Sequence, residues 1–278
     1  IHCIEHVPFE TPGHIADWIV ERGHSFAATR VYHQEPFPGL DAFDALVVMG
    51  GPMGVHDGER FAWLTEEKRF IEAAMQAEKR VLGVCLGSQL IADVLSARVY
   101  RNRFREIGWF PVHSTEAGRA QWNLPSEFTV FHWHGDTFDL PKDAVHLAKS
   151  AACEQQMFSY GTKVLGMLFH AEVTRAGIED FIRHGSSDLG EGPYVQSAST
   201  MGGADPDIAT AHSLLDAFLD RWSAWAIYFA SSVRYARFRP RLEVFDGIRS
   251  MGPPRQDDEY ARRGCFRRRG ARLARLRR

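Results

Sequence analysis

Residues 80–97, RVLGVCLGSQLIADVLSA, constrain the fold more than any other stretch of this sequence. The apolar run before Cys85 is typical of a buried parallel strand, and beyond it apolar residues recur every four positions, as they do in a helix. The chain must therefore turn sharply at Cys85. Gly83 and Gly87 leave room on both sides of that turn, where larger side chains would collide. The segment predicts a strand, a tight turn and a helix.

The same alternation of strand and helix patterns runs through the first hundred residues. Short apolar runs predict strands, and runs with apolar residues three or four positions apart predict helices. Strands are expected at 1–5, 25–32, 44–49 and 80–85, and helices at 12–23, 61–79 and 86–97. This alternation predicts an α/β fold, in which an open, mostly parallel sheet carries helices on both faces.

The segment from 107 to 170 has a different pattern. Five short strand-like runs follow one another there, separated by polar turns. They predict antiparallel strands that extend the sheet into a mixed one. Helix patterns at 173–185 and 207–230 follow and are expected to close a single domain, residues 1–230.

Residues 231–278 differ in composition, because they hold 15 Arg against 5 Asp and Glu in a chain whose net charge is −2. So few apolar residues cannot offset the entropy lost on ordering, and we expect a disordered, solvated basic tail. Two alternatives stay open: a tail that binds nucleic acid or another acidic surface, and a stretch read outside the usual frame of a GC-rich gene. The rest of the chain is acidic, which opposes nucleic-acid binding by the domain itself.

The four cysteines lie far apart and form no CxxC pair, so neither a zinc knuckle nor a disulfide framework is indicated. A reducing compartment is the natural expectation. No apolar run approaches the ~20 residues that span a bilayer. The sequence does not open with the basic and then apolar stretch that is typical of a secretion signal. We therefore expect a cytoplasmic protein that does not bind a membrane.

Cys85 is the first candidate catalytic residue. Its turn would lie at the carboxyl edge of the sheet, where open α/β folds bind ligands. It would also lie at a helix N-terminus, whose partial positive charge favours a thiolate. The alternative is a small buried thiol with a packing role only.

His170 and Glu172 are the candidate partners of that thiol. Both follow the apolar run at 164–169, so they too are expected at the carboxyl edge. His170 can accept the thiol proton, and Glu172 can orient the imidazole ring and stabilise its charged form. The His-x-Glu pattern alone is common by chance, and the alternative is a capping histidine beside a surface glutamate.

Backbone N–H groups are the candidate donors to a negatively charged oxygen. The strand expected at 44–49 ends in Gly50-Gly51-Pro52, which can turn its N–H groups inward, and Leu86 supplies the N–H directly after the nucleophile. The alternative is an ordinary Gly-Pro turn.

Four segments, MGGPMGVHD, GVCLGSQLIA, HWHGDTF and LFHAEVT, resemble the ordered signatures of class I glutamine amidotransferases, over about residues 1–225. The resemblance is greatest to the stand-alone members similar to the amidotransferase domain of GMP synthase. It implies a flavodoxin-like fold and no cofactor. In that family a cysteine attacks the side-chain amide of glutamine, a γ-glutamyl thioester forms, ammonia leaves, and water releases glutamate.

The resemblance also assigns roles to residues of this chain. It implies that Cys85 is the nucleophile, His170 the base and Glu172 the orienting group. It further implies an oxyanion hole at Gly51 and Leu86 and a substrate-binding set of Gly50, Gln89, Trp133 and His134. Two residues depart from the family pattern: Trp133 replaces a serine, and Ala171 replaces a proline.

Several functions stay open on the sequence. Hydrolysis of glutamine would deliver ammonia to a separate synthase partner, because the chain holds no phosphate-binding loop of its own. The same triad can hydrolyse γ-glutamyl peptides or amides, and a catalytically silent binding subunit is a third possibility. His132, His134 and Asp136 alternate along one expected strand and have ligand-type side chains, but the family resemblance explains that segment without a metal.

Overall fold

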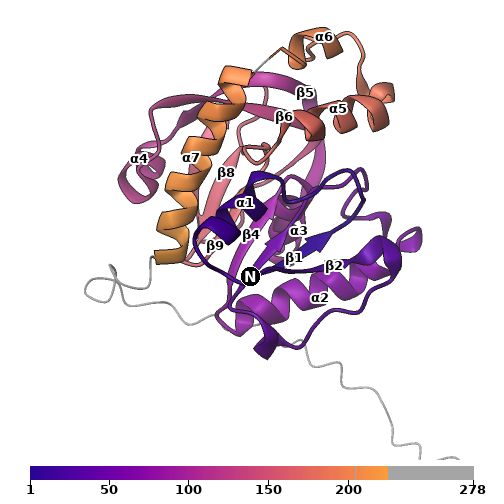
Figure 1. Ribbon diagram of the computed structural model, residues 1–278, viewed down its shortest axis with the longest axis vertical. Coiled ribbons are helices and arrows are strands. Elements are labelled where there is room, and N and C mark those ends of the chain that lie inside the picture. The colour runs from indigo at the N-terminus through magenta and orange to yellow at the C-terminus, as the bar shows by residue number, and fades with distance from the viewer. Residues whose placement is uncertain (204, 225–278) are drawn as a thin grey trace, which may run out of the picture. The chain divides into compact units, whose positions relative to one another are not determined.

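The computed structural model describes residues 1–203 and 205–224 of the chain (Figure 1). Within these residues nine strands form one sheet, in the order β2-β1-β3-β4-β9-β8-β7-β5-β6. The strands are β1 His2–Glu5, β2 Ala27–Arg30, β3 Ala45–Val48, β4 Arg80–Val84, β5 Val99–Ser114, β6 Glu127–Phe138, β7 Ala144–Ser150, β8 Met157–Tyr160 and β9 Val164–Met167. The α-helices are α1 His14–Glu21, α2 Trp63–Gln76, α3 Leu86–Val94, α4 Glu116–Trp122, α5 Arg175–His184, α6 Ala198–Met201 and α7 Asp205–Ala224. The predicted tail at 231–278 and the domain boundary at 230 lie outside the described residues.

Five neighbouring strands, β2, β1, β3, β4 and β9, run parallel to one another. Because parallel strands end at the same edge of a sheet, the residues that follow β1, β3, β4 and β9 meet there. These four strands are adjacent in the sheet although they lie far apart in the sequence. The carboxyl edge of the parallel half is therefore where separate chain segments assemble a site.

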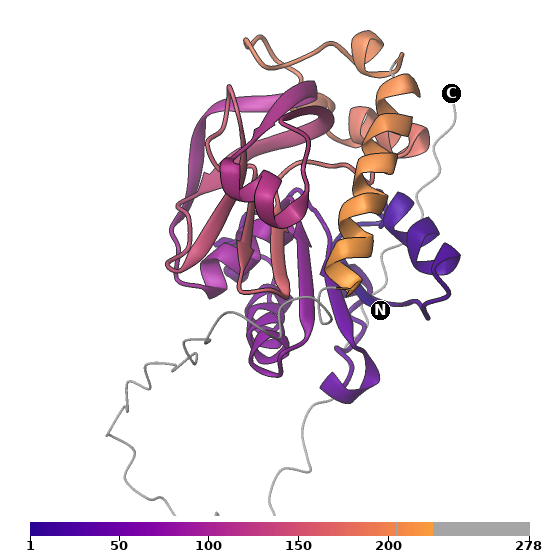
Figure 2. The same cartoon turned by 90° about the vertical axis from the view of Figure 1, so that its left-hand side faces the viewer.

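The remaining strands, β8, β7, β5 and β6, continue the sheet in antiparallel pairs. The long β5–β6 hairpin is the outermost part of this half, and α4 covers β7 and β5 (Figure 2). The predicted fold class, an open mixed sheet with helices on both faces, is confirmed.

Three elements differ from the sequence-based expectation: β5 begins earlier than expected, and the patterns predict neither α4 nor α6. β5 begins at Val99, eight residues before the expected start at 107, because its first half carries exposed charged side chains that hide the strand pattern. A register shift between Arg101 and Glu106 further interrupts the alternation. Helix α4 lies where the pattern predicts only a polar turn. It is too short for a periodic signal, and the side chain of Thr115 caps it by accepting from the N–H of Gly118 at 3.0 Å.

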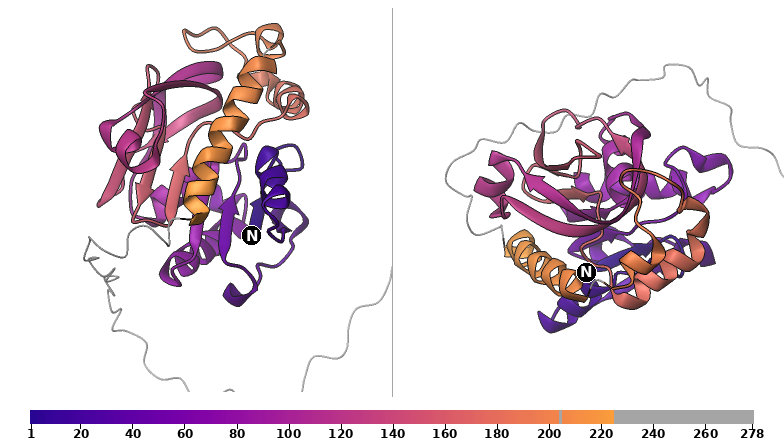
Figure 3. Two further views of the ribbon diagram at one scale, coloured as in Figure 1. Left: turned by 60° about the vertical axis from the view of Figure 1, so that its left-hand side comes forward. Right: turned by 90° about the horizontal axis from the view of Figure 1, so that it is seen from above.

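The core has two parts, one on each face of the sheet. Alternate residues of a strand point to opposite faces, so Val47 of β3 packs with α1 and α7, whereas Leu46 and Val48 pack with α2 and α3. Helix α7, drawn in orange in Figure 3, is the longest described helix at 20 residues. None of the described helices combines the length and the apolar composition needed to cross a bilayer.

Substitution of Trp222 measures how much helix α7 contributes to the stability of the domain. Its side chain is 1% exposed and its indole N–H donates to the carbonyl oxygen of Lys163 at 3.0 Å. We expect Trp222→Ala to lower the free energy of unfolding by about 3–5 kcal/mol, because a large buried side chain is lost. Trp222→Phe retains most of the apolar volume and should cost clearly less. Denaturant unfolding of both variants measures the difference, and a loss below ~1 kcal/mol for the alanine variant would contradict this account of α7.

Candidate active site

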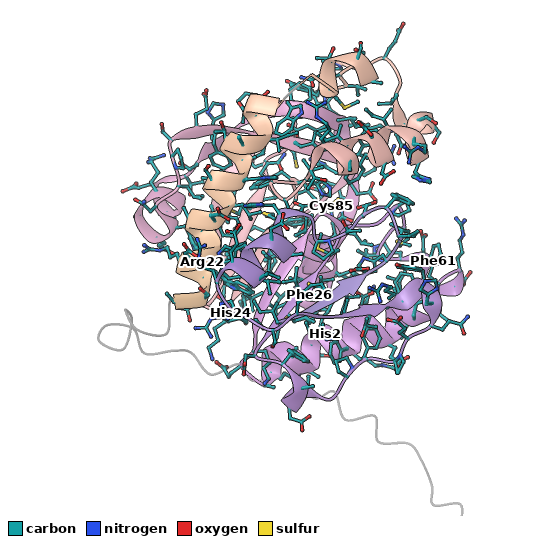
Figure 4. The ribbon with its side chains drawn as sticks, viewed as in Figure 1. His2, Arg22, His24, Phe26, Phe61 and Cys85 are labelled. Atoms are coloured by element: carbon teal, nitrogen blue, oxygen red, sulfur yellow. The ribbon has the colours of Figure 1, made fainter. Side chains whose placement is uncertain are left out.

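Cys85 lies on the predicted turn between β4 and α3. Its φ and ψ of 49° and −108° lie outside the regions that non-glycine residues normally adopt, so this backbone is strained. Neighbouring backbone comes very close here. A Cβ on Gly83 would lie 2.5 Å from the carbonyl carbon of Gly87, and one on Gly87 would lie 2.0 Å from the carbonyl oxygen of Val48. The Cys85 side chain is only 6% exposed and lies near the middle of the ribbon in Figure 4.

His170 and Glu172 follow β9, the strand beside β4. Glu172 Oε1 lies 2.7 Å from His170 Nδ1, and both side chains are almost wholly buried. The backbone N–H of Cys85 donates to the carbonyl oxygen of Met167 at 2.8 Å, which holds the segments after the two strands together. His170 Nε2 is buried and has no hydrogen-bond partner of good geometry among the described residues, so it is available to the thiol and to a substrate.

Cys85 and His170 both lie against Gly50. A Cβ built on Gly50 would lie 3.5 Å from Cys85 Cβ and 3.2 Å from His170 Cε1. Burial raises the pKa of the Cys85 thiol, and His170 opposes that shift. Burial alone would lower the pKa of His170, but the negative charges of Glu172 and Cys85 outweigh it, so the pKa of His170 lies well above its usual value. Burial, which disfavours a thiolate, and the basic imidazole therefore act on the Cys85 thiol in opposite directions.

Gly50 and Gly51 follow β3 and lie directly beside the thiol. The N–H groups of Gly51 and Leu86, the expected oxyanion donors, donate no hydrogen bond within the described part of the chain. His6 Nδ1 donates to the carbonyl oxygen of Gly50 at 2.9 Å. Because the C=O and N–H of a trans peptide point in opposite directions, this bond turns the N–H of Gly51 away from His6.

His6 is in turn held by Glu67 of α2. Glu67 Oε1 lies 2.7 Å from His6 Nε2, and both side chains are fully buried. Burial would lower the pKa of His6, but the charge and hydrogen bond of Glu67, the hydrogen bond to Gly50 and the charge of Glu10 together outweigh burial and raise that pKa. With Nδ1 donating to a carbonyl and Nε2 facing a carboxylate, the ring carries a proton on each nitrogen. A buried ion pair therefore orients the peptide between Gly50 and Gly51.

A cavity of about 360 Å³ opens beside the thiol. Five of the expected site residues line it: Cys85, Gly51, Gln89, Trp133 and His134. The other four are not among its lining residues: Gly50, Leu86, His170 and Glu172. The carbonyl oxygen of Trp133 lies 3.7 Å from Cys85 Sγ.

Trp133, which stands where the family has a serine, packs its ring against helix α5. The ring stacks on Phe181 of α5, with 5.4 Å between the ring centroids. Its indole N–H is directed at Asp188, with 3.5 Å between Nε1 and Oδ2. The backbone carbonyl of Trp133 thus lies beside Cys85, and its ring packs against α5.

The metal-ligand set considered on the sequence is not assembled. Asp136 lies 3.7 Å from Arg101 at the mouth of the cavity, and Glu106 takes its place beside the two histidines. Glu106 Oε2 lies 3.2 Å from His134 Nε2 and 3.6 Å from His132 Nδ1. Burial lowers the pKa of His132 to about 4, so that ring is neutral at physiological pH.

Glu106, His132 and His134 are the groups that could hold a metal, since their ligand atoms lie within 4.8 Å of one another. However, Glu106 Oε2 already accepts hydrogen bonds from Ser150 Oγ at 3.0 Å and Gln156 Nε2 at 2.6 Å. These bonds account for the buried carboxylate without a metal.

Sequence reasoning missed four buried residues of this region: His6, Glu10, Glu67 and Glu106. His6 and Glu10 follow β1, one of the four adjacent parallel strands whose ends meet at Cys85. The carboxyl-edge rule that selected His170 applies equally to the segment after β1 and would have found both. Glu67 and Glu106 had no comparable signal, because their burial depends on the packing of α2 and on the register of β5.

Comparison with known proteins identifies the family of the chain. Residues 13–180 match the family model described as glutamine amidotransferase class-I. A putative glutamine amidotransferase-like protein of Salmonella typhimurium is 35% identical over 72% of this chain and 88% of its own length. A subunit of the glutamine-hydrolyzing GMP synthase of Thermoplasma acidophilum is 32% identical over 48% of this chain and 66% of its own. Gamma-glutamyl peptidase 3 of Arabidopsis thaliana is 27% identical over 65% of this chain and 76% of its own.

A solved structure gives the same result for the fold. The crystal structure of a glutamine amidotransferase from Thermotoga maritima superposes with a TM-score of 0.73 and 33% identity, over 80% of this chain and 97% of that one. Sequence, fold and family model therefore agree, and the chain belongs to the class I glutamine amidotransferase family.

Proposed function

We propose that the chain hydrolyses the side-chain amide of glutamine through a γ-glutamyl thioester on Cys85. The observation that carries this proposal is the arrangement around Gly50: a thiol on a strained turn, a buried imidazole of raised pKa paired with Glu172, and a cavity beside them. The relatives named as amidotransferases and as a peptidase support an enzyme that cleaves amides.

In the first half of the reaction, His170 takes the proton of the Cys85 thiol and the thiolate attacks the amide carbon. The N–H groups of Gly51 and Leu86 stabilise the negative oxygen that forms. His170 then returns its proton to the amide nitrogen, the C–N bond breaks, and ammonia leaves. In the second half a water molecule gives a proton to His170 and attacks the thioester, and glutamate is released.

Hydrolysis of a γ-glutamyl peptide or amide is the second candidate. The cavity of about 360 Å³ is large enough for a molecule bigger than glutamine. Arg101 and Arg105 also line it, and guanidinium groups suit the carboxylate of a peptide leaving group. The peptidase relative in Arabidopsis supports the same reading.

If the ammonia serves a synthesis, we propose that a separate synthase protein receives it. The Thermoplasma relative is named as one subunit of a GMP synthase, which supports a division of the two activities between chains. A catalytically silent binding subunit is the remaining alternative, and the activity of the wild-type protein decides for it or against it.

Cys85→Ala should abolish the release of glutamate from glutamine and from γ-glutamyl dipeptides, because no nucleophile remains. His170→Ala should lose about 100-fold or more of the rate with the proton transfer. Cys3→Ala is the matched control, since Cys3 is a buried thiol of β1 outside the cavity, and it should keep full activity. Glutamate release and circular dichroism are the measurements. Activity that survives in Cys85→Ala would refute the assignment, and an inactive wild-type protein would favour the binding role.

Glu172→Gln should shift the alkaline limb of the pH profile to lower pH. Glu172 is the largest influence that raises the pKa of His170, so its loss lets burial lower that pKa. The imidazolium that protonates the leaving amine is then lost at a lower pH than in the wild-type protein. The measurement is kcat/KM from pH 5 to 10, and an unchanged alkaline limb would contradict the role of Glu172.

Glu67→Gln should lower kcat about tenfold or more with little change in KM, because His6 loses the charge that holds the Gly50 peptide in place. Alkylation of Cys85 by iodoacetamide needs no oxyanion hole, and its rate should stay within about twofold of wild type. Glu66→Gln, an exposed change on the same helix, is the control. A parallel loss of alkylation would indicate a general structural effect instead.

A further inference from the structure

Glu10 is a buried acidic residue of the cavity that the proposed hydrolysis does not use. It lies in the segment between β1 and α1 and its side chain is 8% exposed. It lines the cavity together with Cys85. Its carboxyl group makes no hydrogen bond and no ion pair within residues 1–203 and 205–224. The side chain is largely buried, but its carboxyl oxygens are open to the cavity and are not satisfied by the protein, so a ligand in the cavity can bind them.

The carboxyl group faces the same empty space on Gly50 that His170 faces. A Cβ built on Gly50 would lie 2.2 Å from Glu10 Oε2 and 3.2 Å from His170 Cε1. Only a glycine leaves room for the carboxylate at this place. The Glu10 carboxyl group and the His170 ring therefore approach Gly50 from the same side, the side on which its Cβ would stand.

The segment that carries Glu10 is fixed at both ends. At its start His6 binds the carbonyl oxygen of Gly50. At its end the N–H of His14 donates to the carbonyl oxygen of Glu172 at 2.9 Å, and Gly13, at a φ of +50°, lies so close that a Cβ would be 2.3 Å from that same oxygen. The segment that carries Glu10 is therefore held by Gly50 at its start and by the backbone of Glu172 at its end.

The charged and titratable groups around Glu10 are His170, His6, Glu172 and Cys85. Burial raises the pKa of Glu10 to about 7, the two histidines oppose the rise, and Glu172 adds to it. Cys85 feels the charge of Glu10 in turn. At and above neutral pH the carboxylate is therefore populated, and it accepts hydrogen bonds without donating any.

We propose that the Glu10 carboxylate binds the nitrogen of the scissile amide by accepting a hydrogen bond from its N–H group. The inference rests on the proposed amide hydrolysis and deepens it. The bond orients the nitrogen so that its lone pair can take the proton of His170. When the C–N bond breaks, the bonding electrons leave with the nitrogen, and ammonia or a primary amine departs. Glu10 gains and loses no proton in this step.

The proposal defines a substrate class. Primary and secondary γ-glutamyl amides carry an N–H on the scissile nitrogen and would be assisted by Glu10. An ester of the same glutamyl group has no such N–H and gains nothing. A leaving group such as p-nitrophenolate also needs no proton from His170, so it reports acylation without the step that Glu10 supports.

The test compares kcat/KM for glutamine and for the γ-p-nitrophenyl ester of glutamate, in the wild-type protein and in Glu10→Gln. We expect kcat/KM for glutamine to fall about ten- to a hundredfold, as for a lost hydrogen bond to a charged group, and that for the ester to change less than about threefold. Glu10→Asp keeps the charge but sets it back from Gly50, and should give an intermediate loss on glutamine alone. Glu5→Gln is the control, because Glu5 is a buried carboxyl of the same region that pairs with Arg30.

The outcomes separate this inference from the proposed function. If the wild-type protein acts on neither substrate, the proposed hydrolysis fails. If the wild-type protein acts on both substrates, two results for Glu10→Gln overturn the role of Glu10 alone. One is an equal loss of kcat/KM for glutamine and for the ester, and the other is no loss for either. Thermal unfolding of each variant identifies a folding defect. If Glu10→Gln has one, the ratio of kcat/KM for glutamine to kcat/KM for the ester in Glu10→Asp tests the role of Glu10 instead.

Discussion

The close approach of two backbone segments sets the geometry of everything else in the site. Helix α3 begins so near to β3 that residue 87 can carry no side chain, and residue 83 faces the same restriction from the other side. This packing forces Cys85 into its strained conformation and holds the sulfur at the carboxyl edge of the sheet. Three more segments, which follow β1, β3 and β9, reach the same point because their strands are parallel neighbours of β4. A thiol at that one position is thus surrounded by groups from four separate parts of the sequence.

The site is built largely from buried charge. His170 with Glu172 and His6 with Glu67 are two pairs of nearly inaccessible imidazole and carboxyl groups, one beside the thiol and one behind the Gly50 loop. Burying such pairs contributes little net stability, since the cost of removing water offsets much of the attraction. The carboxylates instead fix the orientation of the two rings. Glu172 holds His170 through Nδ1, which leaves Nε2 for other partners. Glu67 holds His6 through Nε2, so that Nδ1 binds the carbonyl oxygen of Gly50.

Sequence patterns predicted the parts of the fold that depend on local periodicity. The alternating strands and helices of the first hundred residues, the tight turn at Cys85 and the position of His170 after a strand all follow from short-range rules. Helix α4 was not predicted because seven residues give too little periodicity. The first half of β5 was not predicted because arginines on an exposed hairpin mask the alternation of apolar and polar residues. The buried residues around the Cys85 thiol could not be predicted from such short-range rules. Glu67 meets His6 only through the packing of a helix against the sheet, and Glu106 replaces Asp136 beside the histidines because of a register shift that no local pattern encodes.

His14 joins the beginning of the chain to its later parts. Its backbone binds the carbonyl oxygen of Glu172, and its ring stacks on His212 and lies 2.9 Å from Asp216 of α7. His212 in turn donates to the carbonyl oxygen of Val173, the residue after Glu172. A chain emerging from the ribosome therefore presents Cys85 long before residues 212 and 216 have been synthesised. The segments that carry His14 and Glu172 gain these contacts only when residues 205–224 have been made and α7 has packed against them.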